Sequence, residues 1–553
     1  MREGTNAPGA LQPFSLLAAT GACYIAHVTQ TATRVLILGL DGATWTNLSR
    51  WIERGVMPTL GKLMIEGAWG VLNSTTPALT PPAWASLVTG TNPGQHGIYH
   101  FRHTPRGDYY QRRLNTSRDI HAPTIWQRLN QHGKRVGVFN VPMSSPVCPV
   151  DGFITSDAFT AETKGMTTHP PELAKQFPDF IVDVVNYPHA LPGTASYERE
   201  MLAFVDENER VLRCHADATV KLMREQHWQF FMAVWLVLDR IQHFGWKYSD
   251  PTLALRDHIA ERVEKLFALL DLQIGRVVEA AGDDCVIALV SDHGFGPIPQ
   301  TFFNTNCWLV EHGYLKRKHG VVGNLPRALR TKLGAPIDTK FGLVDWSQSK
   351  VWADPLESRA AGLRINRKDR YPEGIVQESE WRALRDKVAE ELMATSYFAE
   401  IHRGEDLYRG AQSEDGPDLI AILTKPYDVP PSFRRDVQAG SLTTPNRHVL
   451  RDGGHEPEGI VLFAGPNIRP ATKLPPQQIE SVVPTVLQLF GLPIADDIDA
   501  EPITAALDES FLRSHAPRRE SEPTTQVPTS QPEYSEEDSA KVEERLRNLG
   551  YLD

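Results

Sequence analysis

The chain contains 553 residues, with 57 Lys and Arg against 68 Asp and Glu, which gives a formal net charge of −11. Hydrophobic residues make up 41% and charged residues 23%, a balance that excludes a disordered or fibrous protein. The acidic excess argues against a nucleic-acid-binding surface, which needs clustered Lys and Arg to displace counterions from phosphates. At roughly 100–200 residues per domain, the length allows one large domain with insertions or several smaller ones.

The cysteines are few and scattered, without any C-x-x-C pair: Cys23, Cys148, Cys214, Cys285 and Cys307. This pattern excludes a disulfide scaffold and a cysteine-based zinc site, and it predicts a cytoplasmic protein. Residues 13–28 are apolar, but Ser, Thr, Gly and His dilute them below the roughly 20 apolar residues that a membrane span needs. We therefore expect no transmembrane segment. Export, or lipid anchoring through Cys23, is the alternative.

The first predicted element covers residues 34–40, a continuous apolar run followed by Asp41-Gly42. Such a run predicts a strand buried on both faces and then a turn. Helical periodicity appears between runs of this kind and is clearest over residues 257–281. Strands that alternate with helices predict an α/β fold, with a mostly parallel central sheet covered by helices on both faces. The other apolar runs span residues 136–141, 230–238, 285–290 and 460–464.

The alternation weakens between residues 297 and 451, where a helix around residues 378–393 is the main predicted element. We interpret this stretch as a cap inserted into the main sheet. Further along, Pro, Ser, Thr and Glu dominate a predicted linker. The expected division is a disordered leader (1–33), the first part of the α/β core (34–296), the inserted cap (297–451), the completing part of the core (452–510), a flexible linker (511–533) and a C-terminal docking helix (534–553).

The docking helix is predicted from Ser535, which precedes an acidic first turn. Val542, Leu546 and Leu549 then form an apolar stripe along one face, and Gly550 ends the pattern. A short helix with a single apolar stripe is expected to lie against the body of the protein.

Three aspartates, Asp41, Asp239 and Asp292, each follow an apolar run that predicts a strand. Ligands of open α/β sheets bind at the carboxyl ends of the strands, so we expect these carboxylates to meet there and to repel one another unless cations lie between them. His243 follows Asp239 by four residues and His293 follows Asp292 directly. Mixed Asp and His ligands suit zinc or manganese. A turn or a helix start explains each motif singly, so the inference depends on the three together.

A hydroxyl-rich segment, residues 76–90, contains Thr80 followed by Pro81 and Pro82. This order predicts a helix with Thr80 as its N-cap and Pro81 at its first position. Thr80 can serve simply as a cap. A hydroxyl at a helix N-terminus also faces unpaired amides and the positive end of the helix dipole, which stabilise an alkoxide and bind phosphate oxygens. With a metal ion beside it, Thr80 would be an activated nucleophile.

The order of these motifs resembles the alkaline phosphatase superfamily, and most of all its type I phosphodiesterase/nucleotide pyrophosphatase branch, over residues 34–506. The motifs are Asp41-Gly42, the block from Thr80 to Gly97, Asp239-x-x-x-His243, Ser291-Asp-His-Gly294 and Gly454-His455. By this resemblance, one metal ion is bound by Asp41, Asp292, His293 and the nucleophile Thr80, and the other by Asp239, His243 and His455.

His455 competes for its role with His448, only seven residues away. We prefer His455 because Gly453-Gly454 allows a close backbone approach and a buried strand follows, as in the family. A departure from the family pattern lies at Ala83, three residues after the nucleophile. Nucleotide pyrophosphatases usually carry an Asn there that helps to hold a phosphate oxygen, so Ala83 puts a nucleotide substrate in doubt.

The resemblance implies a metal-dependent hydrolase of small-molecule phosphate esters, most of all a phosphodiesterase, that acts through a covalent phosphothreonine. It implies two divalent ions, with zinc preferred and manganese the alternative. A phosphomonoesterase or phosphomutase of the same superfamily is the first rival, for which Arg240 or Lys247 would supply additional cationic contacts. A non-catalytic protein that binds metal or phosphate is the second rival.

Overall fold

The computed structural model describes residues 34–109, 113–160, 165–253, 255, 257–318, 342–446, 450–521 and 535–548. The expected leader over residues 1–33 lies outside these ranges, as do His448 and Leu549. In this part of the chain, no helix has the length and apolar character that crossing a membrane requires.

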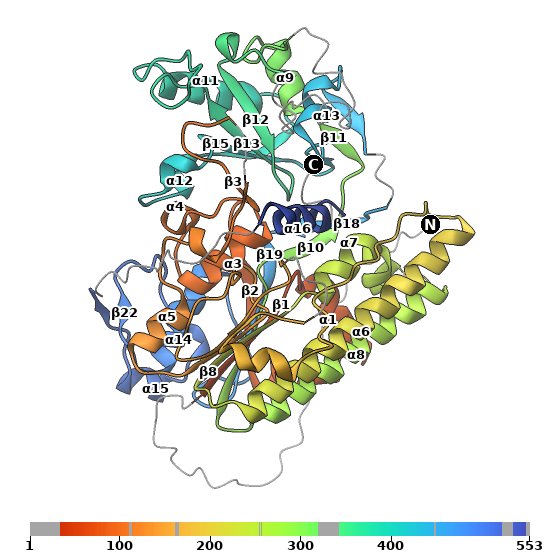
Figure 1. The fold of residues 1–553 in the computed structure, drawn as a ribbon, viewed down its shortest axis with the longest axis vertical. Coiled ribbons are helices and arrows are strands. Elements are labelled where there is room, and N and C mark those ends of the chain that lie inside the picture. The colour runs from red at the N-terminus through yellow and green to blue at the C-terminus, as the bar shows by residue number, and fades with distance from the viewer. Residues whose placement is uncertain are drawn as a thin grey trace, which may run out of the picture.

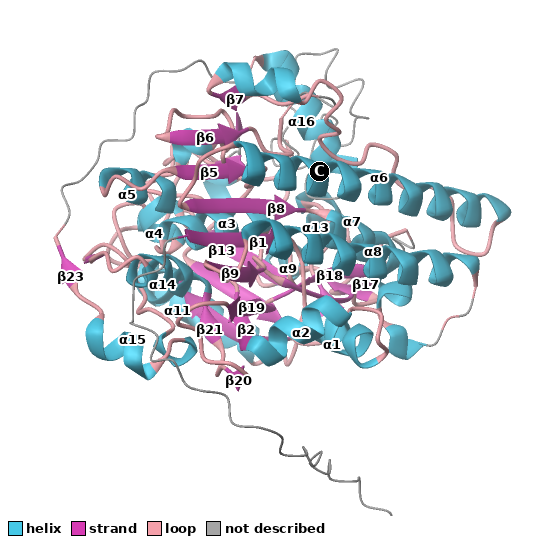
Figure 2. Ribbon diagram, turned by 90° about the horizontal axis from the view of Figure 1, so that it is seen from below, coloured by secondary structure: helices cyan, strands magenta, loops and turns pink. Residues whose placement is uncertain are grey.

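The centre of the fold is a sheet whose middle strands are all parallel. β1 (Arg34–Leu40) pairs with β9 (Cys285–Val290) on one side and with β8 (Phe230–Trp235) on the other. Beyond β8, the parallel order continues through β5 (Val136–Phe139) to β6 (Gly152–Thr155). Figure 2 shows these strands side by side. The expected mostly parallel sheet is therefore confirmed.

On the other side of β9 the sheet becomes antiparallel. β19 (Glu458–Ala464) pairs antiparallel with both β9 and β2 (Gly67–Asn73). The strand predicted over residues 460–464 thus joins the central sheet, although the apolar run contains no information on its direction. β2 alternates between buried and partly exposed residues, which is the pattern of a strand near a sheet edge.

Helices cover both faces of the sheet. Figure 1 shows α6 (Ala195–Glu225) and α8 (His258–Ala281) on one side, and α3 (Thr80–Thr89), α5 (Ile125–Gln131) and α14 (Val482–Leu489) on the other. The sequence predicts α8 almost to the residue, because Asp257 caps its first turn by accepting a hydrogen bond from the amide of Ala260.

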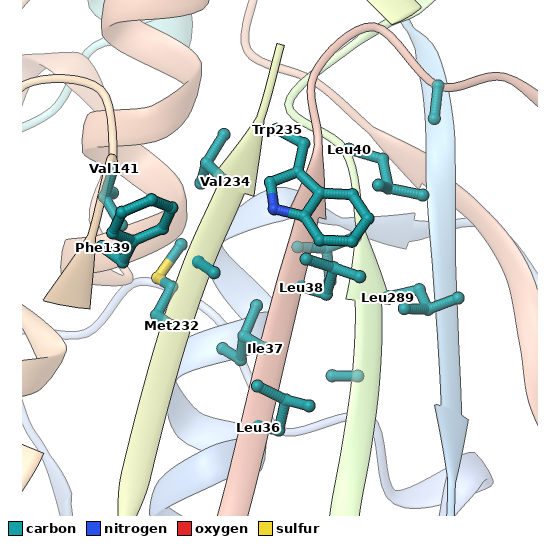
Figure 3. Packing of buried hydrophobic residues seen from close by; sticks show 14 of the residues in the cluster. Leu36, Ile37, Leu38, Leu40, Phe139, Val141, Met232, Val234, Trp235 and Leu289 are labelled. Atoms are coloured by element: carbon teal, nitrogen blue, oxygen red, sulfur yellow. The ribbon is translucent and has the colours of Figure 1, made fainter. Parts of the chain in front are cut away.

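The core consists of the apolar runs that predict the strands. Every residue of β8 and β9 is buried, and in β1 only Arg34 is partly exposed. Figure 3 shows side chains of neighbouring strands packed together, among them Leu38 of β1 and Leu289 of β9, which are partners in the register. Burial on both faces explains why these strands lack the polar alternation of a surface strand.

One predicted boundary is wrong in a way that matters for the site. The apolar run over residues 230–238 predicts a single strand, but β8 ends at Trp235 and α7 (Val237–Ser249) begins two residues later. Val237 and Leu238 are apolar because the first turn of α7 is itself buried. A short apolar run does not distinguish a buried strand from a buried helical turn.

The stretch interpreted as a cap has a sheet and a hydrophobic cluster of its own. β12 (Val351–Pro355), β13 (Ala360–Ile365), β15 (Leu419–Leu423) and β14 (Phe398–Arg403) form an antiparallel sheet in that order. Helix α11 (Trp381–Met393) contributes Trp381, Val388 and Leu392 to the cluster. In Figure 1 this region lies above the central sheet.

The chain enters and leaves this region through two paired strands. β10 (Gly294–Pro297) runs antiparallel to β18 (Gly453–Glu456), and Phe295 lies opposite His455. The β10–β18 pair therefore brings His455, remote in sequence, next to the residues that follow β9.

The first part of the predicted linker, residues 511–521, is packed against the body of the protein, which the prediction of a flexible linker from residue 511 does not allow. α15 (Glu509–Ser514) contains Phe511, which is fully buried in the main cluster, and β23 (Arg519–Glu520) pairs with β22 (Ile494–Ala495). Phe511, the neighbouring Leu512 and the β22–β23 pair thus attach this otherwise polar stretch to the body. Residues 522–533 of the predicted linker lie outside the described ranges. In α16 (Glu536–Asn548), Val542 and Leu546 are buried in the same cluster.

Gly39 allows β1 and α3 to approach closely, and this gives a first prediction. A Cβ atom at Gly39 would lie 2.4 Å from the Trp84 ring and 2.8 Å from Val234. Gly39→Ala should therefore lower the free energy of unfolding by about 1–3 kcal/mol through overpacking, measured by urea denaturation. Gly275→Ala is the matched control, because a Cβ there would lie 3.3 Å from a Thr59 side chain and α8 gains helix propensity. Equal stability for Gly39→Ala and the wild type would contradict this packing.

Candidate active site

Two of the predicted carboxylates stand side by side because their strands are neighbours. In the β1–β9 register Gly39 pairs with Val290, so the residues two positions further on, Asp41 and Asp292, lie at the same level of the sheet. Both side chains are buried, and the Gly42 amide donates to Asp292 Oδ1 at 3.2 Å. The end of the β1–β9 pair thus holds two carboxylates away from solvent.

The third carboxylate comes from a helix rather than from a strand end. Asp239 lies in the first turn of α7, and His243 lies one turn further on the same face. His243 Nε2 is 3.3 Å from Asp239 Oδ1, and His455 Nε2 on β18 is also 3.3 Å from this oxygen. The expectation that Asp239 directly follows a strand is therefore corrected, but Asp239 lies at the same edge of the sheet as the other two.

Thr80 belongs to the site, although not as the predicted cap. Leu79 takes the N-cap position of α3 with an extended backbone, and Thr80 is the first helical residue, followed by the two prolines. The helix therefore begins one residue earlier than predicted, since both prolines are accommodated in its first turn. The Thr80 hydroxyl makes no capping bond, and its Oγ1 lies 3.3 Å from His293 Nε2.

Other hydroxyls of this helix are engaged elsewhere. Ser86 Oγ lies 2.9 Å from His96 Nε2, and Thr89 Oγ1 donates to the Ala85 carbonyl at 2.7 Å. Thr80 is thus the hydroxyl of α3 that faces the Asp and His cluster.

Among the described residues, two groups of three side chains have the spacing of metal ligands. One contains Asp41, Asp292 and His293, and the other contains Asp239, His293 and His455, with the ligand atoms of each group within 4.8 Å of one another. The first group contains three of the four residues that the family resemblance assigns to one metal ion, and it does not include Thr80. The second contains His293 where the resemblance implies His243, whose Nε2 lies 3.2 Å from His455 Nε2.

The first group fits a divalent cation, as the environment of its carboxylate oxygens shows. Asp41 Oδ1 and Asp292 Oδ2 are buried and accept no hydrogen bond. Burial raises the pKa of both carboxyls well above the usual range, and the charge of Asp239 raises it further. Buried carboxylate oxygens without donors are costly unless a cation binds them.

Asp239 has a different environment. Burial alone raises its pKa, but His243, His455 and Arg240 outweigh that effect and hold the pKa of Asp239 well below the usual range. Burial also lowers the pKa of His243 and of His455 to about 4. Neutral imidazoles and an ionised carboxylate are the protonation states in which these side chains bind a metal ion.

Backbone carbonyls orient the three histidine rings. Nδ1 of His293 lies 3.0 Å from the Gly294 carbonyl oxygen, Nδ1 of His243 lies 3.2 Å from that of Gly453, and Nδ1 of His455 lies 3.3 Å from that of Ala78. Donation from Nδ1 to a carbonyl favours the tautomer whose Nε2 presents a lone pair. In His293 and His455 this Nε2 faces the carboxylate cluster. His243 differs, because the guanidinium of Arg451, which can only donate, lies 2.6 Å from its Nδ1.

Two supporting residues were not indicated by sequence. The Trp84 indole donates to Asp41 Oδ2 at 2.9 Å and is fully buried. Asp183 binds Arg240, whose Nη1 donates to Asp239 Oδ2 at 2.6 Å. Asp183 lies 57 residues from Arg240 in sequence and belongs to none of the recognised motifs.

The cationic contacts considered for the phosphomonoesterase rival are used in other ways. Arg240 is buried between Asp183 and Asp239, with distances of 2.8 and 2.6 Å, so its charge is neutralised inside the protein. Lys247 lies over the rings of Tyr197 and Tyr248, and its Nζ is 4.0 Å from Asp452. The structure thus contradicts the expectation that Arg240 is available to a substrate.

Comparison with known proteins identifies the family. The chain matches the model of type I phosphodiesterases/nucleotide pyrophosphatases over residues 35–432, and it belongs to this family. The resemblance inferred from the motifs is thereby confirmed. No curated protein sequence gives a significant match.

Several solved structures are similar at low sequence identity. Phosphonoacetate hydrolase from Sinorhizobium meliloti 1021, in complex with phosphonoformate, is 15% identical with a TM-score of 0.48, covering 82% of this chain and 94% of that one. Murine ectonucleotide pyrophosphatase/phosphodiesterase 5 is 12% identical with a TM-score of 0.45, covering 83% and 95%. Its human counterpart is 13% identical with a TM-score of 0.45, covering 87% and 99%.

The hydrogen bond from Trp84 to Asp41 gives a second prediction. Trp84→Phe keeps an aromatic ring but removes the donor that orients Asp41, so it should weaken zinc binding about 10- to 100-fold, measured by competition with a chelator. Trp45→Phe is the matched control, because its indole donates to the Gly70 carbonyl instead. Unchanged zinc affinity in Trp84→Phe would show that this hydrogen bond does not position the ligand.

Proposed function

We propose that this protein is a metal-dependent hydrolase of phosphate esters, acting as a phosphodiesterase on a small molecule. The observation that carries the proposal is the buried cluster in which Asp41, Asp239 and Asp292 meet three histidines and the Thr80 hydroxyl. The family to which the chain belongs supports the same class of reaction. A silent binding protein is less well supported, since all seven positions keep side chains that can bind a metal ion or attack phosphorus.

We assign one metal ion to Asp41, Asp292, His293 and Thr80, and the other to Asp239, His243 and His455. The mixed Asp and His donors suit zinc best and manganese next. When bound, the two ions supply positive charge for the attacking and leaving oxygens of the phosphoryl transfer.

The nucleophile in this proposal is Thr80. Its oxygen forms a bond to phosphorus while the bond to the leaving group's oxygen breaks, which gives a phosphothreonine diester and an alcohol. Water then forms a new bond to phosphorus, the bond to Thr80 Oγ1 breaks, and the phosphomonoester departs as the hydroxyl regains its proton. The start of α3 provides the positive end of a helix dipole for the phosphate oxygens. It offers few amide donors, because Pro81 and Pro82 have no N–H and the Ala83 amide donates to the Leu79 carbonyl at 3.0 Å.

Two features favour a diester that is not a nucleotide. Arg240, the expected extra cation for a monoester dianion, is neutralised by Asp183 and Asp239. Ala83 is buried on α3, at the position where nucleotide pyrophosphatases usually have Asn, and its methyl group offers no hydrogen bond to a phosphate oxygen.

The role of Thr80 gives a third prediction. Thr80→Ala should lower turnover of an aryl phosphodiester by several orders of magnitude, since losing a catalytic nucleophile costs about 10⁶-fold in a protease. Because Thr80 makes no capping bond, the variant should lose only about 1 kcal/mol of stability, the cost of a buried methyl group. Rapid-quench mass spectrometry of the wild type should find phosphate on Thr80.

Thr89→Ala is the control, since this hydroxyl bonds within its own helix, and Thr80→Ser should keep part of the activity. Near wild-type turnover by Thr80→Ala would rule out the covalent step and favour direct attack by water.

We also propose a cytoplasmic location, because the four cysteines in the described part of the chain are free thiols: Cys148, Cys214, Cys285 and Cys307. Fractionation of the native host and sequencing of the mature N-terminus check this fourth prediction, with an expected soluble fraction and an unprocessed start. A lipid-modified Cys23 at the mature N-terminus would show that the protein is exported and anchored instead.

A further inference from the structure

A cavity of about 500 Å³ adjoins the metal centre and reaches His455. Its volume lies within the range of small-molecule binding sites, roughly 300–1,000 Å³. It lies between the central sheet region and the cap, since residues of both line it. Apolar walls come mainly from aromatic rings and prolines: Phe244, Phe302, Pro297, Pro299, Pro430 and Pro431.

Four arginines from four different segments line this cavity. Arg359 lies in the turn between β12 and β13, Arg435 on α13 (Phe433–Gln438), Arg451 just before β18, and Arg547 on α16. Only three acidic side chains line it with them: Glu357, Asp428 and Glu456. In a chain with a net charge of −11, a local excess of arginine points to an anionic ligand.

Two of the three acidic side chains lie close to basic side chains of the protein. Glu456 pairs with Arg359 at 2.9 Å and with Lys425 at 3.0 Å, while Glu357 lies 3.9 Å from Arg451. Arg451 also has its Nη2 2.6 Å from His243 Nδ1, so the arginine group extends to the edge of the proposed metal centre.

Helix α16 holds Arg547 in place at the cavity. Val542 and Leu546 are buried, and Arg545 donates to the Ala158 carbonyl at 2.6 Å. Glu543 pairs with Arg102 at 2.7 Å and accepts from Arg547 at 2.8 Å, so one carboxylate serves two guanidinium groups. Figure 1 shows α16 between the central sheet and the cap. The C-terminal helix therefore forms part of the cavity wall and contributes the guanidinium of Arg547 to it.

We infer that α16 completes the substrate pocket, and that Arg547 is a specificity-determining residue that binds an anionic group on the non-reacting part of the substrate. The substrate class is a phosphodiester whose second ester group carries a carboxylate or a phosphate on an apolar body. This inference rests on the proposed phosphodiesterase function. Apolar walls accommodate the body of that group, and the planar guanidinium suits either anion.

The test uses three diesters that all release 4-nitrophenolate: phenyl 4-nitrophenyl phosphate, its 4-carboxyphenyl analogue and its 4-phosphonophenyl analogue. The wild type should have a higher kcat/KM for at least one charged diester than for the neutral one. Arg547→Ala should reduce this preference about 10- to 100-fold, which corresponds to the usual free-energy contribution of a hydrogen bond to a charged group. Arg547→Glu should reverse it, and Arg547→Lys should restore part of it. The charged diester with the higher kcat/KM shows whether the pocket binds a carboxylate or a phosphonate.

Arg213→Ala is the matched control, because Arg213 also pairs with a glutamate four residues earlier at 2.8 Å but lies on α6. It should leave the preference unchanged. Loss of the same preference in Arg213→Ala, or an equal preference in the wild type and Arg547→Ala, would overturn the inference. Hydrolysis of the neutral diester would still support the proposed function, whereas no hydrolysis of any diester would contradict that function itself.

Discussion

Asp41, Asp239 and Asp292 are buried together at one edge of the central sheet, and their mutual repulsion is the constraint on which the other features of the site depend. Two like charges 4 Å apart cost about 4 kcal/mol even at an effective dielectric constant of 20. Arg240 compensates Asp239 but is shared with Asp183. The remaining negative charge lies on Asp41 and Asp292, each of which has one buried oxygen, Oδ1 and Oδ2 respectively, that accepts no hydrogen bond. Cations between these carboxylates resolve the repulsion and at the same time provide the chemistry that we propose.

The core and the site are connected through Trp84. Gly39 has no side chain, so the Trp84 ring can lie against β1, and its indole then reaches Asp41 two residues further along. Packing in the sheet therefore fixes the orientation of a proposed metal ligand. The β10–β18 pair makes a second connection, because the strands that lead into and out of the cap also bring His455 to Asp239.

The parts predictable from sequence are those governed by local chemistry. Continuous apolar runs predict β1, β8 and β9, and the residues that follow them contain the motifs of the site. The motif spacing also brings Asp239 and His243 together, because four residues make one helical turn. The predictions are wrong where burial removes the distinguishing pattern: the first turn of α7 is as apolar as the strand before it, and α3 begins at Thr80 because both prolines are accepted in its first turn.

Long-range partners could not be predicted. Asp183 binds Arg240 across 57 residues, and Arg547 reaches the cavity from the far end of the chain. No local sequence pattern predicts either contact, because each depends on how distant loops and α16 pack against the folded core. The same holds for Phe511, which is buried although its neighbourhood is polar. Specificity is therefore the property least visible in the sequence.

Anomalous X-ray diffraction from crystals grown with zinc, and separately with manganese, tests the central claim most directly. The account predicts two anomalous peaks at the appropriate absorption edge, one beside Asp41 and Asp292 and the other beside Asp239 and His455. Crystals that bind no metal at these carboxylates, with Asp41 and Asp292 protonated and hydrogen-bonded to each other instead, would contradict it.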